Sequence, residues 1–280
     1  MIPMPNNLPQ VIEEPNLSHA WGRVLLHVLD NSKRKLAPLV VSVTGFTDGL
    51  AAEDMEIRKA LDALLVTKDR KFSSKVTALT IFPYDAWVRR GRLPVREFTD
   101  WYLKDFFPRL QARNKLNGRG TYFERMVRFQ GSKKPKNGPP QIREKNQLDH
   151  LISIWRRDRE KGGSPRHSAL QVSVFDPVQD HTGGKLLGFP CLQQVSFSYD
   201  EADQLAVNAY YPTQYVVDRA YGNYLGLCHL GHFMARDMGL NFVRLNCFVG
   251  LPDLGSDLNK EELAPLADLI RSRLPNRDDV

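Results

Sequence analysis

The chain has 280 residues, 42% of them hydrophobic, and a formal net charge of +7. Its length and hydrophobic content are enough for one large domain or two small ones with a substantial core. No apolar run approaches the roughly 18 residues of a membrane span, and Met1–Pro15 lacks the basic-then-apolar pattern of a signal peptide, so we expect a cytoplasmic protein that does not enter the membrane. Three cysteines without a Cys-x-x-Cys pair argue against a disulfide framework and a zinc site.

The first half of the chain predicts an arm followed by helices and strands. Residues 1–16 are rich in Pro and Asn and predict a loose N-terminal arm, so that the folded domain spans residues 17–280. Hydrophobic periodicity then predicts a helix that starts at the cap Ser18, a strand over Leu39–Val43, a helix over Glu53–Val66, a strand over Val76–Phe82 and an amphipathic helix over Val95–Leu110.

The second half begins with a break at 131–140, which consists of Gly, Pro and Lys with almost no apolar residue. We interpret it as an insertion-like loop within one domain. The elements predicted after it are a helix over Gln147–Glu160, strands over Leu170–Phe175, Val195–Tyr199 and Leu205–Tyr211, a buried helix over Tyr221–Met238, a strand over Phe242–Val249 and a helix over Glu261–Leu274. Closely spaced strands with amphipathic helices predict an α+β fold in which helices flank one sheet.

Cys191 is the most informative candidate for chemistry. It follows Gly188-Phe189-Pro190 and lies between two predicted strands, where a Pro-Cys step can point a thiol out of a rigid edge. The alternative is a buried, inert thiol, which is the commonest state of a free cysteine. Cys228 and Cys247 lie in apolar segments and are predicted to be core residues. His229 and His232 have no third ligand at a matching spacing, so we predict core histidines and no metal site.

Four pieces of sequence, taken in order, resemble the thymidylate synthase family, including its pyrimidine hydroxymethylases. They lie between Asn146 and about Leu240, roughly a third of the chain. The pieces are Gln147-Leu148-Asp149 with Ser164-Pro165-Arg166, then Pro190-Cys191, then Tyr210-Tyr211-Pro212-Thr213, and finally Asn223 at the start of a helix. Upstream, Tyr122-Phe123-Glu124-Arg125 is similar to an aromatic stretch of the family. Pro212 stands where the family has a phosphate-binding arginine, and the family's His-x-Tyr pair for the ribose is not evident.

The resemblance implies a thymidylate synthase-like domain with a mixed β-sheet that carries out one-carbon transfer in nucleotide biosynthesis. A methyl or hydroxymethyl group would pass from a reduced folate, 5,10-methylenetetrahydrofolate, to C5 of a pyrimidine nucleotide. Cys191 would be the nucleophile that adds to C6, which requires a thiol with a lowered pKa. Glu97, or alternatively Glu124, would handle protons at the ring.

The substrate-binding candidates are Arg166, Tyr211, Thr213 and Asn223. Arg166 would favour the thiolate, Thr213 would donate to a phosphate, and Asn223 would hydrogen-bond the ring amide. Tyr211 belongs to the stretch that is similar to the family's phosphate-binding turn. Each has an ordinary alternative role: a surface ion pair for Arg166, a turn for Thr213 and a helix N-cap for Asn223.

The resemblance also implies a homodimer that forms through one face of the sheet. The basic region 125–145 predicts a second type of partner, which is nucleic acid. The alternative is that this region is a loop whose charged side chains are simply exposed to solvent. The competing hypothesis for the whole protein is a catalytically inactive member of the fold that binds or senses a nucleotide, nucleic acid or a protein partner. Cys191→Ser separates the two, because an enzyme would lose turnover and a sensor would keep its ligand affinity.

Overall fold

The structure is a computed structural model that describes residues 9–31, 38–67, 72–113, 120–133, 141–181, 190–255 and 258–275. Its strands are β1 (Gln10–Glu14), β2 (Leu39–Val43), β3 (Phe46–Thr47), β4 (Leu50–Ala51), β5 (Phe129–Lys133), β6 (Gln141–Lys145), β7 (Gln171–Ser173), β8 (Gln194–Tyr199), β9 (Gln204–Tyr215) and β10 (Asn241–Asp253). Its α-helices are α1 (Leu17–Asp30), α2 (Met55–Val66), α3 (Ser74–Ile81), α4 (Tyr84–Arg89), α5 (Val95–Trp101), α6 (Phe107–Arg113), α7 (Tyr122–Val127), α8 (Gln147–Glu160), α9 (Pro177–Asp180), α10 (Tyr221–Met238) and α11 (Lys260–Arg273). Two π-helical segments, Tyr102–Phe106 and Val216–Ala220, precede α6 and α10.

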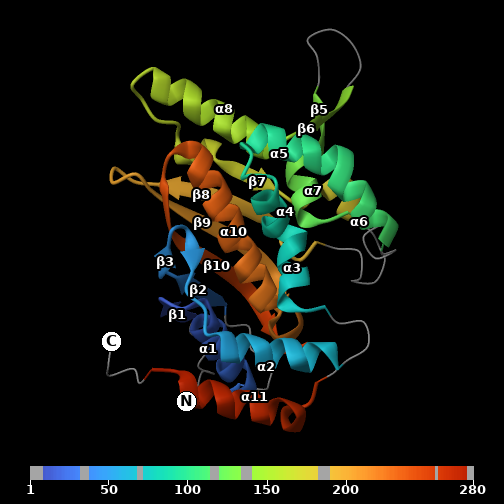
Figure 1. Ribbon diagram of the computed structural model, residues 1–280, viewed down its shortest axis with the longest axis vertical. Helices are drawn as coiled ribbons and strands as arrows, with labels where there is room; N and C mark the ends of the chain where they lie inside the picture. The colour runs from blue at the N-terminus through green and yellow to red at the C-terminus, as the bar shows by residue number, and fades with distance from the viewer. Residues whose placement is uncertain are drawn as a thin grey trace, which may run out of the picture.

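A six-stranded mixed sheet with the order β1-β2-β10-β9-β8-β7 forms the centre of the molecule (Figure 1). β10 runs antiparallel to β2 and parallel to β9, whereas β8 is antiparallel to both of its neighbours. In β9, Leu205, Val207 and Ala209 are buried, while Asn208 and Tyr210 alternate with them on the opposite face. The predicted α+β fold with helices against one sheet is therefore confirmed.

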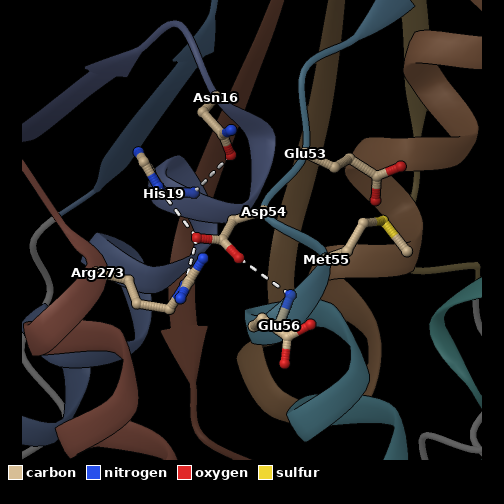
Figure 2. Close-up of a pocket in the computed structure, with 7 residues that line it drawn as sticks. All are labelled: Asn16, His19, Glu53, Asp54, Met55, Glu56 and Arg273. Carbon is tan, nitrogen blue, oxygen red and sulfur yellow. Dashed lines mark hydrogen bonds and ion pairs between the residues drawn. The ribbon is translucent and has the colours of Figure 1, made fainter.

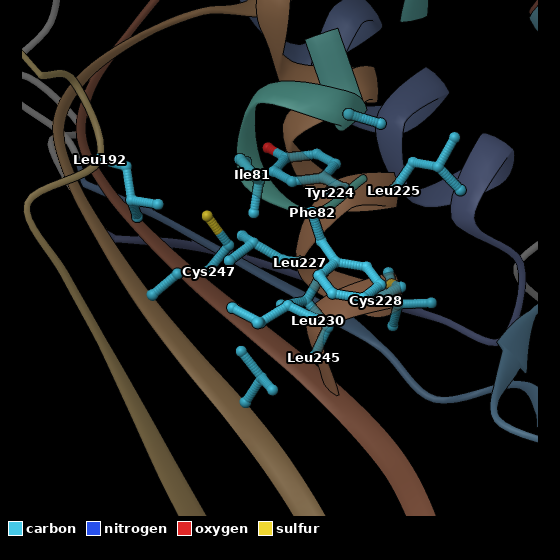
Figure 3. Packing of buried hydrophobic residues seen from close by; sticks show 14 of the residues in the cluster. Ile81, Phe82, Leu192, Tyr224, Leu225, Leu227, Cys228, Leu230, Leu245 and Cys247 are labelled. Atoms are coloured by element: carbon cyan, nitrogen blue, oxygen red, sulfur yellow. The ribbon is translucent and has the colours of Figure 1, made fainter. Parts of the chain in front are cut away.

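α10 is the helix on which the rest of the helical layer packs. It crosses the sheet over β9 and β10, and α3 lies along its other side (Figure 1). Its side chains are buried on nearly every face, as predicted for Tyr221–Met238, and it ends at Gly239 in the left-handed conformation. Figure 3 shows how Tyr224, Leu227 and Leu230 of α10 enclose the core together with Leu245 and Cys247 of β10.

Two glycines let α3 approach α10 closely. A Cβ atom at Gly222 would lie 2.5 Å from the carbonyl oxygen of Ser74, and one at Gly226 would lie 2.8 Å from that of Ala78. Both distances are far inside van der Waals contact, so no larger residue fits without moving α3. The helix–helix contact therefore depends on the absence of side chains at these two positions.

The strand predicted over Val76–Phe82 is wrong, because Ser74–Ile81 forms α3. Ser73 caps this helix, and its buried residues recur at helical spacing: Ser74, Thr77, Ala78 and Ile81. The β-branched residues favoured a strand locally, but packing against α10 decides the conformation. Elsewhere the predicted helix over Val95–Leu110 forms as α5, a π-helical segment and α6.

The loose arm predicted for residues 1–16 is also wrong where the structure describes it. Residues 10–14 form β1, an edge strand parallel to β2, in which Ile12 and Glu14 are buried. Residues 1–8 of the predicted arm lie outside the described residues. Of the predicted loop at 131–140, residues 131–133 belong to β5, which pairs with β6, and residues 134–140 also lie outside the described residues.

One end of the molecule is held by a polar junction between α1, α2 and α11. Asp54 caps α2 by accepting from the backbone N–H of Glu56 at 3.0 Å, and its second oxygen pairs with Arg273 at 2.5 Å (Figure 2). Burial raises the pKa of Asp54, but the hydrogen bonds from Arg273 and the helix backbone outweigh it and leave that pKa below its usual value. Within the described ranges, every helix is too short or too polar to cross a lipid bilayer.

Gly222→Ala should destabilise the protein by about 1–3 kcal/mol, because the added methyl group overpacks the α3–α10 contact. A urea unfolding curve measures this change, and Gly163→Ala is the control because its Cβ would be 3.6 Å from the nearest atom. A Gly222→Ala variant as stable as the wild type would contradict the close-packing account, since alanine is otherwise the better helix former.

Candidate functional site

The segment that carries Cys191 is clamped just before β8. The backbone N–H of Gln193 donates to Tyr210 at 3.0 Å, and its carbonyl accepts from Val174 at 2.9 Å. The Gln193 side-chain amide donates to the carbonyl of Pro190 at 2.9 Å. Leu192 is fully buried and lies in the same core layer as Cys247 (Figure 3). Cys191 itself is partly exposed, so its thiol is held at a fixed place within reach of solvent.

Two polar side chains act on the Cys191 thiol. Tyr122, the first residue of α7, hydrogen-bonds it through the phenol, and Arg219 of the π-helical segment Val216–Ala220 places a positive charge near it. Burial raises the pKa of Cys191, and the charge of Arg219 and the bond from Tyr122 lower it. Burial prevails, so the pKa lies above its usual value and the free protein holds a protonated thiol at neutral pH.

A fully buried polar layer lies behind the thiol. The hydroxyl of Tyr211 has no hydrogen-bond partner within the described part of the chain, and it is surrounded by Cys247, Tyr122, Cys191 and Tyr224. Burial and these neighbours raise the pKa of Tyr211 well above its usual value, so the phenol stays neutral. Next to it, Tyr224 donates to Gln214 at 2.8 Å. A buried phenol without a partner is costly, and it leaves a donor free for a ligand.

The structure brings Cys191 and Tyr211 together, and it corrects the surroundings of Thr213 and Asn223. Thr213 does not close a turn: it is a half-buried residue of β9 and pairs with Leu251. Asn223 is the third residue of α10 and is 2% exposed. The helix is capped at Ala220, so the alternative role of Asn223 as an N-cap is wrong.

The structure does not bring Arg166, Glu97 or Glu124 to the thiol. Arg166 is exposed at the start of a short 3-10 helix, and the cation that lowers the pKa of Cys191 is Arg219 instead. Glu97 is exposed in the first turn of α5. Glu124 is on the same helix as Tyr122, but its carboxylate is engaged by Arg128 at 2.7 Å.

Arg219 is the residue at this site that the sequence reasoning missed. It lies four residues before Asn223, directly ahead of the buried helix. A cation at that place is the signal from which its role at the site could have been predicted. It is half-buried, and its guanidinium lies 5.5 Å from the centre of the Phe72 ring without an ion-pair partner among the described residues. Such an unpaired cation beside a thiol can bind an anion.

The residues described around Cys191 bring a thiol, a phenol and a guanidinium together. In the part of the chain that the structure describes, no group of three or more His, Cys, Asp or Glu residues can hold a metal ion. All three cysteines are free, and Cys228 and Cys247 are buried as predicted. No model of a known protein family matches the chain, and a comparison with curated protein sequences finds no match either. Function is therefore inferred from the side chains themselves.

Arg219→Gln and Tyr122→Phe should each slow alkylation of Cys191 by iodoacetamide about two- to fivefold at pH 8, because each removes an interaction that favours the thiolate. The rate against pH, followed by intact mass, should show an apparent pKa above that of an ordinary cysteine, and higher still in both variants. Arg166→Gln is the matched control and should leave the profile unchanged. A profile equally displaced by Arg166→Gln would refute the assignment of Arg219.

Proposed function

We propose that the chain is a thymidylate synthase-like enzyme that transfers a methyl or hydroxymethyl group to C5 of a pyrimidine nucleotide through Cys191. The observation that carries this proposal is the thiol itself, partly exposed on a clamped segment between Tyr122 and Arg219. A structural cysteine needs neither a fixed place near solvent nor an adjacent cation. Both are what a covalent nucleophile requires.

The proposed reaction begins when the thiol of Cys191 loses its proton and its sulfur adds to C6 of the ring. The electron pair of the C5–C6 bond moves to C5, conjugated with the C4 carbonyl, and C5 bonds to the carbon of a donor at the formaldehyde oxidation level. Loss of the C5 proton expels the donor's carrier group, and water that adds to the new carbon gives a hydroxymethyl group as the thiolate leaves and the C5–C6 double bond returns. A methyl product would need a two-electron reductant in place of water. We infer that a phosphate of the substrate bound at Arg219 orients the ring over the sulfur.

The described residues offer specific partners for such a ring. Asn223 is a buried amide, and an amide suits the paired donor and acceptor of a pyrimidine N3–C4 edge. Thr213 and the hydroxyl of Tyr211 supply further donors, and Arg219 replaces the missing arginine at Pro212 as the candidate for the phosphate. Tyr122 is the group nearest the sulfur that can pass a proton, whereas Glu97 lies exposed on α5. Arg166 is likewise exposed and free to meet a second copy of the chain.

Reduced folate remains the donor that the resemblance implies. The described side chains beside Cys191 provide a phenol and a guanidinium, and they do not form a cradle for a pterin ring. None of the steps above is therefore assigned to the folate.

An inactive nucleotide-binding protein is the second candidate, and one observation favours it. The pKa of Cys191 is above the usual value, although catalysis requires a thiolate. In that case the same residues, Cys191, Tyr211 and Arg219, would contact a nucleotide without turnover. The proposal for the basic region 125–145 is weaker, because Arg125 is bidentate to Asp180 and Arg128 pairs with Glu124.

The uncovered face of the sheet supports the proposed homodimer. An apolar row crosses four strands in register and contains Val11, Val40, Phe248 and Tyr210. Val11 is 61% exposed, and the rings of Phe248 and Tyr210 lie 5.6 Å apart. The neighbouring row is polar, and its side chains bond to one another: Glu13, Arg244, Ser42, Asn246, Asn208 and Ser198. A flat face whose polar groups are already satisfied can pack on a second copy at little desolvation cost.

Mixing the protein with 5-fluoro-dUMP, with and without methylenetetrahydrofolate, should give a covalent adduct on Cys191 that is detected by intact mass and peptide mapping. Ribonucleotide and cytosine analogues in parallel identify the preferred ring. Cys191→Ala should abolish the adduct, and Cys247→Ser should retain it because that thiol is buried.

The same samples separate the two candidate functions. If no analogue forms an adduct, but calorimetry shows that Cys191→Ser and the wild type bind a nucleotide equally, the protein is a sensor and the enzyme proposal fails. Arg219→Gln should weaken binding of the nucleotide more than that of the nucleoside, because only the nucleotide carries a phosphate.

Phe248→Lys should convert a dimer of the 32.0 kDa chain into monomers, because each interface would bury an unpaired ammonium group at a cost of about 3–5 kcal/mol. Sedimentation velocity measures the mass of both proteins. Val178→Lys is the matched control, since Val178 is 91% exposed on α9, away from the sheet face. A wild-type monomer, or a dimer indifferent to Phe248→Lys, would rule out this interface.

A further inference from the structure

A second cavity, which shares no lining residue with the Cys191 site, opens between α3, α4, α10 and the β3–β4 hairpin. Its volume is about 320 Å³, which is within the range of small-molecule sites. Leu225 and His229 line it from α10, and because they are four residues apart they share one face of that helix. Asn223 lies two residues before Leu225 and so points to the opposite side of α10.

The interior of this cavity is apolar and flat. Ala78 of α3, Phe82 at its end and Leu225 of α10 form part of its wall, and Phe82 and Leu225 belong to the buried core drawn in Figure 3. The ring of Tyr84 stacks on the imidazole of His229 with centroids 4.2 Å apart and planes at 19°. Such walls favour a planar, hydrophobic ligand body.

His229 was predicted to be a core histidine, but it is half-buried and lines this cavity. Its Nδ1 is buried and has no hydrogen-bond partner among the described residues. Burial and the nearby charge of Arg58 lower the pKa of His229 to about 3, so the imidazole is neutral at physiological pH. The ring therefore adds a neutral aromatic surface to the cavity wall.

The charged groups of the lining leave a surplus of positive charge. Glu53 is occupied by Arg58 at 3.0 Å and by the hydroxyl of Tyr221 at 2.7 Å. Asp85 pairs with Lys75 at 2.6 Å across the gap between α4 and α3. Arg89, one turn after Asp85 on α4, is exposed and has no ion-pair partner in the described part of the chain. An anion at the mouth would meet Arg89 and the remaining donors of Lys75.

We propose that this cavity is a binding site for a small organic monoanion with a flat apolar body, of the aromatic carboxylate class. The body lies against Phe82, Leu225 and the stacked pair of Tyr84 and His229, and the carboxylate lies at the mouth beside Arg89. This proposal does not depend on the one-carbon chemistry proposed for Cys191, and separate measurements test it.

Three probes with the same bicyclic body test the site: 2-naphthoate, 2-naphthylmethanol and 2-naphthylmethylamine. Saturation-transfer NMR and fluorescence titration of the full chain should rank their affinities as anion, then neutral, then cation. Arg89→Gln should weaken 2-naphthoate about three- to fivefold and leave the alcohol unchanged. Arg96→Gln, an exposed arginine on α5 outside the cavity, is the matched control.

A cavity-filling variant tests the location. Leu79→Trp places a large side chain at a half-buried lining position and should abolish binding of all three probes, whereas Val76→Trp on the exposed face of α3 should not. Thermal unfolding checks that both variants fold, and Cys191→Ala should bind as the wild type does. Absence of saturable 2-naphthoate binding, equal affinity for the three probes, or binding that survives in a folded Leu79→Trp variant would each overturn the proposal.

Discussion

The close contact between α3 and α10 is the constraint on which the rest of the structure depends. Gly222 and Gly226 remove the side chains that would hold the two helices apart, so α10 is buried between α3 and the sheet. A helix buried on both sides must direct each residue into a defined environment. Tyr224 meets Gln214 of β9, Asn223 faces away from Leu225, and His229 reaches the separate cavity beneath Tyr84. The packing of α10 thus positions Tyr224 behind the Cys191 thiol and His229 in the separate cavity.

The chemistry at Cys191 reflects a balance between burial and charge. Withdrawal from water raises the pKa of the thiol, while Arg219 and Tyr122 oppose this effect. The buried hydroxyl of Tyr211 adds a donor that the protein itself does not use. A site arranged in this way is most reactive when the ligand supplies the remaining interactions, since the protein alone does not stabilise the thiolate. This dependence on a ligand is common to both the enzyme and the sensor hypotheses.

Sequence reasoning predicted the parts of the fold that have strong local patterns. Gln147–Glu160 and Tyr221–Met238 have the predicted bounds, and the strands after Cys191 form where alternation placed them. It failed where contacts between residues distant in the sequence determine the conformation. Residues 74–81 are helical because they pack against α10, and residues 10–14 join the sheet because they pair with β2. At the candidate site it found Cys191 and Tyr211. It could not find Arg219, because no local pattern indicates that a π-helical segment will carry that cation back to the thiol.

The polar row on the uncovered sheet face also has a direction. Ser42 of β2 donates to Asn246 of β10, Asn246 to Asn208 of β9, and Asn208 to Ser198 of β8, so these three bonds share one direction across the strands. Arg244 of β10 donates in the opposite sense, to Ser42 and Glu13. Each asparagine accepts on one side and donates on the other, and rotating either amide by half a turn would set like groups against each other. The three bonds from Ser42 to Ser198 therefore reinforce one another. They give this part of the sheet face an electrical polarity across β2, β10, β9 and β8, roughly at right angles to the chain direction.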